Sequence, residues 1–126
     1  MSQPVRVLLV DDHEDMLSML QFMMARRGYQ VHTAVSGEAA LLEARDFVPQ
    51  VVVSDIGLPG IDGHQLIAAL RKMDDLAAFK AIALTGFDRD ENRDCDDAHA
   101  FDAQLTKPVD FESLFQLIER LAKDSN

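Results

Sequence analysis

Short apolar segments alternate with segments of helical spacing five times along this chain. The apolar segments are rich in aliphatic and β-branched residues, as is typical of buried strands. They cover Val5–Val10, Gln30–Ala34, Val51–Asp55, Ala81–Thr85 and Ala103–Thr106. Strands that alternate with helices predict a parallel sheet with helices on both faces. With 126 residues the chain suits one such domain and is too short for two, so we expect a single doubly wound α/β domain over residues 1–126.

The segments between these strands predict five helices. Three of them cover Asp15–Arg27, His64–Met73 and Asp90–His99, the last with few apolar residues. The other two begin at Ser36 and Asp110, whose side chains are suited to capping a helix N-terminus. The first of these segments carries Met16, Leu20, Met23 and Arg27 at helical spacing, and Gly28 is expected to end it.

The composition narrows the classes of partner. Twelve Lys and Arg against twenty-two Asp and Glu give a formal net charge of −10, which disfavours nucleic acids and anionic membranes and favours a metal ion or a cationic partner surface. Cys95 is the only cysteine, so no internal disulfide is expected and a reducing compartment is the natural setting. The N-terminus reaches charge too early for a secretory signal, and no apolar run approaches membrane-spanning length. We therefore expect a soluble cytoplasmic domain.

Chemically active side chains stand at the ends of four predicted strands. Asp11 and Asp12 follow the first strand, Asp55 ends the third, Thr85 ends the fourth and Lys107 follows the fifth. Because the C-terminal ends of parallel strands share one edge of the sheet, where α/β proteins bind ligands, these side chains are expected to converge. Clustered carboxylates repel one another unless a cation lies among them, and Mg²⁺ fits a set of carboxylate, carbonyl and water oxygens. Asp55 is then a candidate nucleophile for a phosphoryl group, with the lysine and threonine placed for its oxygens.

The motifs "VLLVDDHED", "VVVSDIGLPGIDG", "ALTG" and "LTKPVD" occur in an order and spacing that resemble a two-component response-regulator receiver domain of the chemotaxis-regulator type. The resemblance covers essentially the whole chain. It implies a flavodoxin-like sheet of strand order 2-1-3-4-5 with five helices. It also implies that Asp55, itself a metal ligand, accepts a phosphoryl group from the phosphohistidine of a sensor histidine kinase or a phosphotransfer domain.

The resemblance also implies roles for the surrounding residues. Asp12 would bind Mg²⁺ directly, Asp11 would bind it through water, and the backbone carbonyl of Gly57 would complete the protein ligands. Thr85 would donate a hydrogen bond to a phosphoryl oxygen, and Lys107 would pair with another. Such a domain catalyses only its own phosphorylation and dephosphorylation, so we do not expect an enzyme that turns over an outside substrate.

The chain departs from the family pattern at Gln104, where the family often has an aromatic or histidine switch residue three positions before the lysine. The aromatic readout of phosphorylation is therefore not expected in its usual form. The segments "SDIGLPGIDG" and "FDAQLTKPVD" resemble receivers of hybrid sensor kinases more than receivers that precede DNA-binding domains. No charge pattern indicates a dimer face, and a monomer is favoured.

Other interpretations of these residues remain open from the sequence. A Mg²⁺-dependent aspartyl-phosphate phosphatase also combines Asp, Thr and Lys, although it would place a DxD motif on the first strand. A flavodoxin-type flavin site would need a polar, glycine-rich loop where this chain has "DDHED". A scaffold without phosphorylation is disfavoured by the complete acidic set. The histidines show no metal-ligand spacing among themselves and are expected to be plain surface residues: His13, His32, His64 and His99.

Overall fold

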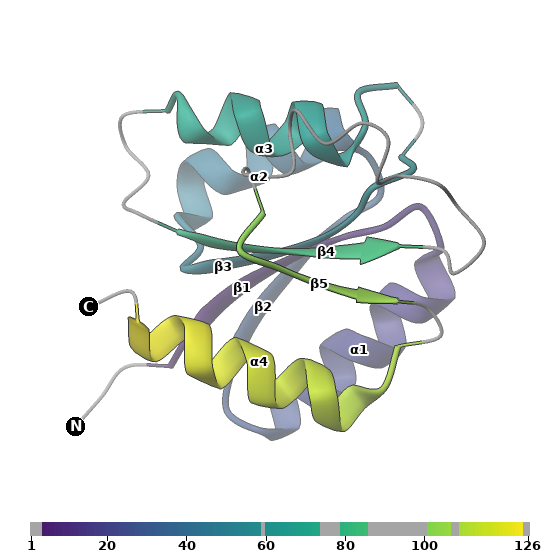
Figure 1. Cartoon of the computed structure of the whole chain (residues 1–126). Helices are drawn as coiled ribbons and strands as arrows, with labels where there is room; N and C mark the ends of the chain where they lie inside the picture. The colour runs from purple at the N-terminus through teal and green to yellow at the C-terminus, as the bar shows by residue number, and fades with distance from the viewer. Residues whose placement is uncertain (1–3, 59, 74–78, 86–100, 107–108, 125–126) are drawn as a thin grey trace.

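The computed structural model describes residues 4–58, 60–73, 79–85, 101–106 and 109–124. Strands and helices alternate through most of this part of the chain (Figure 1). The strands are β1 (Arg6–Val10), β2 (Gln30–Ala34), β3 (Val51–Asp55), β4 (Lys80–Thr85) and β5 (Ala103–Thr106). The described helices are α1 (Glu14–Arg26), α2 (Gly37–Phe47), α3 (Gly63–Arg71) and α4 (Phe111–Asp124). The helix predicted over Asp90–His99 lies outside the described residues.

The five strands form one parallel sheet in the order β2-β1-β3-β4-β5. This confirms the predicted doubly wound α/β fold and its strand order. β1, β3 and β4 are central and almost wholly buried, whereas β5 at one edge alternates between half-buried and exposed residues. The apolar character of each strand therefore follows its place in the sheet, since a central parallel strand is covered on both faces.

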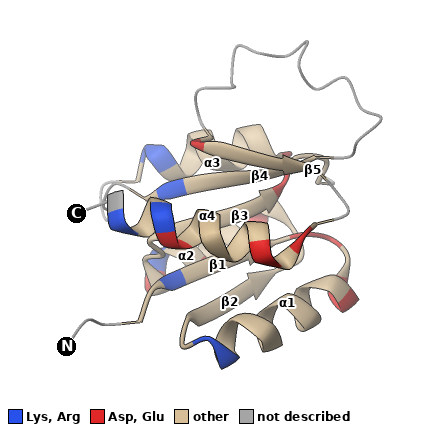
Figure 2. Cartoon of the chain, turned by 60° about the horizontal axis from the view of Figure 1, so that its bottom comes forward, with Lys and Arg blue, Asp and Glu red and all other residues tan. Residues whose placement is uncertain are grey.

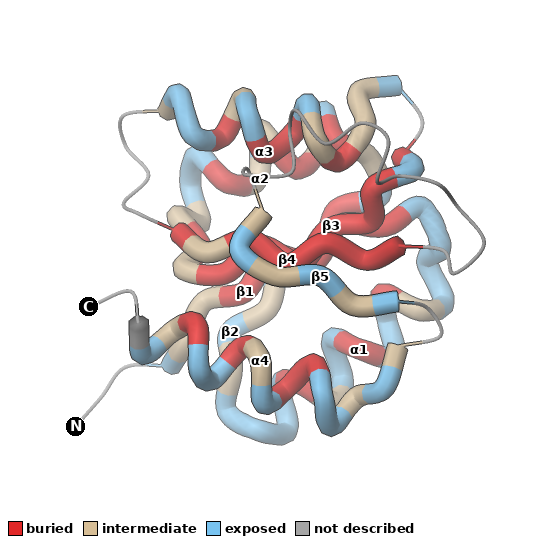
Figure 3. Tube along the Cα trace, in the orientation of Figure 1, coloured by how far each residue is buried: buried red, intermediate tan, exposed pale blue. Residues whose placement is uncertain are grey.

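The sheet separates two hydrophobic cores. α1 and α4 cover one face, and α2 and α3 cover the other (Figures 1 and 3). Successive side chains of a strand point to opposite faces, so Val7 and Leu9 of β1 enter the first core while Leu8 and Val10 enter the second. Both cores extend to the C-terminal ends of the strands and support that edge of the sheet from two sides.

The described helices begin and end close to the predicted positions, but the spacing of apolar residues on the first helix does not identify all of its buried side chains. α1 buries Leu17, Leu20 and Met24, whereas Met16 and Met23 are only partly buried and pack at the margin of the core. The apolar residues of this helix span more than one face, so their spacing does not select the buried one. Among the described residues, no helix is long and apolar enough to cross a membrane.

Candidate functional site

The sheet brings the predicted strand-end residues to one edge. Asp11 directly follows β1, and Asp55 is the last residue of the neighbouring strand β3. Thr85 ends β4 one register position beyond Leu84, which is the pairing partner of Asp55. Asp11, Asp55 and Thr85 are only 1%, 8% and 5% exposed. Buried polar residues are uncommon at the end of an apolar sheet, so their concentration here marks a candidate site.

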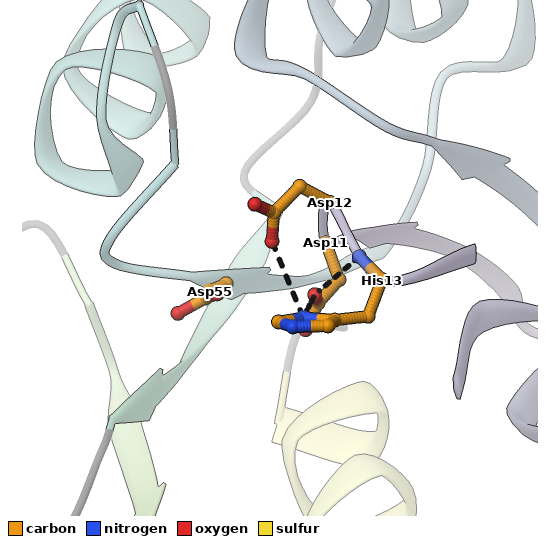
Figure 4. Close-up of side chains that lie close together, drawn as sticks. All are labelled: Asp11, Asp12, His13 and Asp55. Atoms are coloured by element: carbon orange, nitrogen blue, oxygen red, sulfur yellow. Dashed lines mark hydrogen bonds and ion pairs between the residues drawn. The ribbon is translucent and has the colours of Figure 1, made fainter. Parts of the chain in front are cut away.

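Three carboxylates and one imidazole lie together at this edge (Figure 4). One ligand atom from each of Asp11, Asp12, His13 and Asp55 lies within 4.8 Å of the corresponding atoms of the others. The first three residues come from the loop after β1, and Asp55 comes from β3. The side chains of Asp12 and His13 are 40% and 69% exposed, whereas that of Asp11 is buried. The cluster therefore has a buried floor and a side that is open to solvent.

Hydrogen bonds of ordinary length orient two of the carboxylates. The backbone N–H of His13 donates to Asp11 Oδ1 at 2.9 Å, and His13 Nδ1 lies 2.9 Å from the same oxygen. His13 Nδ1 also lies 3.3 Å from Asp12 Oδ1. In the loop after β3, the backbone N–H of Gly57 donates to Asp55 Oδ1 at 3.2 Å. Backbone donors close to a carboxylate fix its direction.

The loop after β3 is held tightly against the start of α3. The N–H of Gly63 donates to the carbonyl of Ile56 at 2.9 Å, and Ile56 N–H donates to Leu84 of β4 at 3.2 Å. A Cβ on Gly63 would lie 2.6 Å from the carbonyl oxygen of Asp55. The helix itself begins with a capping box, in which Asp62 and Gln65 each accept a hydrogen bond from the other's backbone N–H. The position of Asp55 is therefore fixed by the close packing of α3 as well as by the sheet.

The donor set fits a hard divalent cation. Carboxylate oxygens are the ligands that Mg²⁺ and similar ions prefer. Three acidic groups that share so small a volume would repel one another without a positive partner. The loop after β1 supplies two of them, and the last residue of β3 supplies the third. Asp11, Asp12 and Asp55 are thus the side chains that would hold such an ion.

The charged residues at the helix ends make the edge of the sheet that carries the acidic cluster still more negative. In a parallel α/β fold, helix N-termini lie near the edge at which the strands end. The first turns of α1, α2 and α4 carry the acidic residues Glu14, Asp15, Glu38 and Glu112, whereas the first turn of α3 carries none. Last turns carry the basic residues Arg26, Arg45, Arg71 and Lys123. Figure 2 shows acidic residues where β1 passes into α1 and at the start of α4. This negative edge favours the approach of cations to the cluster.

The structure shows the positions of three of the remaining predicted residues but not of the fourth. Thr85 is buried at the end of β4, and Gly57 is exposed in the loop after β3. Lys107 lies outside the described residues. Gln104 is exposed on the edge strand β5, beside a groove that β5 shares with α4.

His13 is the residue that sequence reasoning missed. It was expected to be an unremarkable surface histidine, and it is indeed mostly exposed. Its ring nevertheless lies against the carboxylates of Asp11 and Asp12. The only signal in the sequence was its position directly after the acidic pair, since the turn that brings the ring back cannot be read from spacing among histidines.

Known proteins of one family match this chain over most of its length. A model of the response regulator receiver domain family matches residues 7–119. PilH of Pseudomonas aeruginosa is 34% identical over 113 residues, which cover 90% of this chain and 93% of that protein. Response regulator TrrA of Thermotoga maritima, solved in complex with Mg²⁺-BeF, is 29% identical with a TM-score of 0.79, and the match covers 93% of this chain and 98% of that one.

A further solved structure is the receiver domain of a signal transduction histidine kinase from Syntrophus aciditrophicus. It is 25% identical with a TM-score of 0.82, and the match covers 95% of this chain and 91% of that one. The sheet order, the acidic cluster at the strand ends and these matches agree. The chain therefore belongs to the response regulator receiver domain family, whose members act in two-component signalling.

Proposed function

We propose that Asp55 is the residue that accepts the phosphoryl group in this receiver domain, and that Mg²⁺ assists at a site formed with Asp11 and Asp12. One observation carries the proposal. Asp55 ends a buried central strand, and its carboxylate lies within 4.8 Å of ligand atoms of two other acidic side chains. Family membership supports the same chemistry.

The proposed transfer makes one bond and breaks one. A carboxylate oxygen of Asp55 attacks the phosphorus of a phosphohistidine, an O–P bond forms and the N–P bond breaks. The departing ring keeps the electron pair of the broken bond and leaves as neutral imidazole, because its other nitrogen carries a proton. In the separate dephosphorylation step a water oxygen attacks the phosphorus, a new O–P bond forms, the bond between Asp55 and phosphorus breaks, and Asp55 returns as a carboxylate while inorganic phosphate leaves with the protons of the water.

The residues around Asp55 orient it and balance charge. The Gly57 N–H, 3.2 Å from Oδ1, holds the carboxylate in a fixed direction. A bound divalent cation would neutralise the acidic cluster and the phosphoryl oxygens. We assign Thr85 a hydrogen bond to one phosphoryl oxygen, supported by its buried place at the end of the adjacent strand. Lys107 would pair with another oxygen, an assignment that rests on the sequence alone.

The proposal includes the partner and the setting. A sensor histidine kinase fits the family, and a phosphotransfer domain is the other donor that we propose. The net charge of −10 supports a protein surface rather than nucleic acid as the partner. The single cysteine supports a cytoplasmic location. We further propose that residues 1–126 act as one domain and that the domain is monomeric.

Asp55 can be tested by phosphorylation without a kinase. Wild type, Asp55→Asn and Asp46→Asn are incubated with Mg²⁺ and acetyl phosphate, and the intact mass is measured. Asp46 is an exposed acidic residue on α2 and serves as the matched control. We expect one added phosphoryl group on wild type and on Asp46→Asn, and none on Asp55→Asn. Equal labelling of Asp55→Asn, or no labelling of wild type, would refute the assignment.

The phosphatase alternative is not favoured by the family to which the chain belongs. A receiver hydrolyses only its own aspartyl phosphate, so p-nitrophenyl phosphate with Mg²⁺ should give no sustained release of nitrophenol. Steady turnover that disappears in Asp55→Asn would instead identify a phosphatase.

A further inference from the structure

The ring of His13 occupies an unusual place for a helix-capping residue. His13 is the N-cap of α1, with an extended backbone (φ −98°, ψ 100°), and its side chain makes no capping hydrogen bond. N-cap positions usually hold Ser, Thr, Asp or Asn, whose side chains turn towards the helix. Here the ring turns away from the helix and lies against two carboxylates (Figure 4). A role in capping therefore does not explain this histidine.

The hydrogen bonds hold the ring at the cation site itself. The backbone N–H of His13 binds Asp11 Oδ1 and so fixes the turn, while Nδ1 lies 2.9 Å from that oxygen and 3.3 Å from Asp12 Oδ1. His13 thus presents a nitrogen between the oxygens that would bind the cation. In its neutral form an imidazole nitrogen is itself a metal ligand.

We propose that His13 is a further metal ligand and that it gives this site a preference for first-row transition ions over Mg²⁺. The inference rests on the proposed cation site of Asp11, Asp12 and Asp55 and names its selectivity. Mg²⁺ is bound by hard oxygen ligands, whereas imidazole suits Zn²⁺, Ni²⁺, Cu²⁺ and Fe²⁺. In a site of three carboxylates and one imidazole, the nitrogen therefore adds little to the affinity for Mg²⁺ and much to the affinity for Ni²⁺.

The selectivity, rather than the affinity for one ion, is the diagnostic quantity. Oxygen ligands alone already bind Ni²⁺ more tightly than earlier ions of the same series. A contribution of the imidazole appears only as a change in the ratio of the dissociation constants for Mg²⁺ and Ni²⁺ when His13 is replaced. If the ring acts only by orienting Asp11, its loss weakens the binding of both ions by the same factor.

The test is calorimetric titration of wild type, His13→Gln and His13→Asn with MgCl₂ and with NiCl₂. The asparagine variant restores a good N-cap and guards against loss of the helix. His32→Gln is the matched control, because it removes an exposed imidazole from β2, where His32 pairs with Leu8. Co²⁺ absorption spectra give a second readout, since loss of a nitrogen ligand shifts the visible bands.

We expect both His13 variants to lose about 10-fold or more in affinity for Ni²⁺, since even the loss of a group that only orients a metal ligand costs about 10-fold or more. Their affinity for Mg²⁺ should change by less than about 2-fold, and His32→Gln should match wild type. Unchanged Ni²⁺ binding, or an equal loss for both ions, would overturn the role of His13 while leaving the cation site intact. If wild type binds neither ion, the Mg²⁺ site of the proposed function fails, and the inference fails with it.

Discussion

The packing of Gly63 against the phospho-acceptor strand gives a prediction of stability and reactivity together. In Gly63→Ala the new Cβ would lie 2.6 Å from the carbonyl oxygen of Asp55 and 2.8 Å from the Cα of Ile56. Ordinary contacts between such atoms are about 3.5 Å, so α3 and the loop must separate by roughly 1 Å. Both obstacles are backbone atoms in a buried region. A rotamer change therefore cannot relieve the clash.

Overpacking of this kind costs about 1–3 kcal/mol, and we expect the upper part of that range because only backbone can move. For a domain of this size about 2–3 kcal/mol corresponds to a fall of roughly 8–12 °C in Tm. Because the strain acts on the carbonyl of Asp55, the rate of labelling by acetyl phosphate should also fall. Urea unfolding measures the first effect, and intact mass against time measures the second.

Gly28→Ala is the control for backbone strain without a clash. Gly28 lies between α1 and β2 with φ +95°, and a Cβ there would meet no atom within 4 Å. The positive φ alone should cost about 1 kcal/mol, and labelling of Asp55 should be unchanged. A Gly63→Ala protein that unfolds at the wild-type urea concentration would show that α3 can move freely. The close packing of Gly63 would then contribute nothing measurable to the free energy of unfolding.

Two further predictions concern the cores and the surface. Leu70 is fully buried and Leu42 is 64% exposed, so Leu70→Ala should lower the free energy of unfolding by about 2–5 kcal/mol and Leu42→Ala by less than about 0.5 kcal/mol; equal urea midpoints would contradict the burial. Burial and the nearby Glu119 carboxylate raise the pKa of the Tyr29 phenol above its ordinary value, against an opposing effect of Arg27. As pH rises, the phenol therefore ionises in the unfolded chain before it ionises in the folded one. The contribution of this group to the free energy of unfolding is fully present below the unfolded pKa and is lost as pH rises through the folded pKa. Ultraviolet titration should show late ionisation of Tyr29, and Glu119→Gln should bring it earlier; an unchanged titration would exclude Glu119 as a cause.

The architecture could be predicted because parallel sheets leave a strong record in the sequence. Val51–Asp55 is apolar along its whole length because β3 is buried on both faces. Asp11 and Asp55 could be expected to meet because strand ends converge whatever the intervening loops do. The strand order came from resemblance to the family, since no property of a single strand specifies its neighbours.

The details that escaped prediction depend on rotation and on loops. Met23 and Met24 are adjacent and chemically identical, so the sequence does not say which of them enters the core, and the structure buries Met24. His13 reaches the carboxylates through a local turn that spacing does not encode. The role of Gly63 depends on how closely a helix approaches a strand, which is a property of the assembled fold. Lys107 lies outside the described residues, so its role stays a prediction.

The opposite charges at the two ends of the helices have a consequence for how the domain meets another protein. Among the described residues, the acidic first turns of α1, α2 and α4, together with the carboxylates at the strand ends, lie towards one end of the strands, and basic last turns lie towards the other, which gives a charge separation along the strand direction. In the field of a positively charged surface such a dipole rotates as it diffuses, so that Asp55 and its neighbours turn to the front before any contact forms. Association would then be faster than random orientation allows, and added salt would remove the advantage once the screening length falls below the size of the domain.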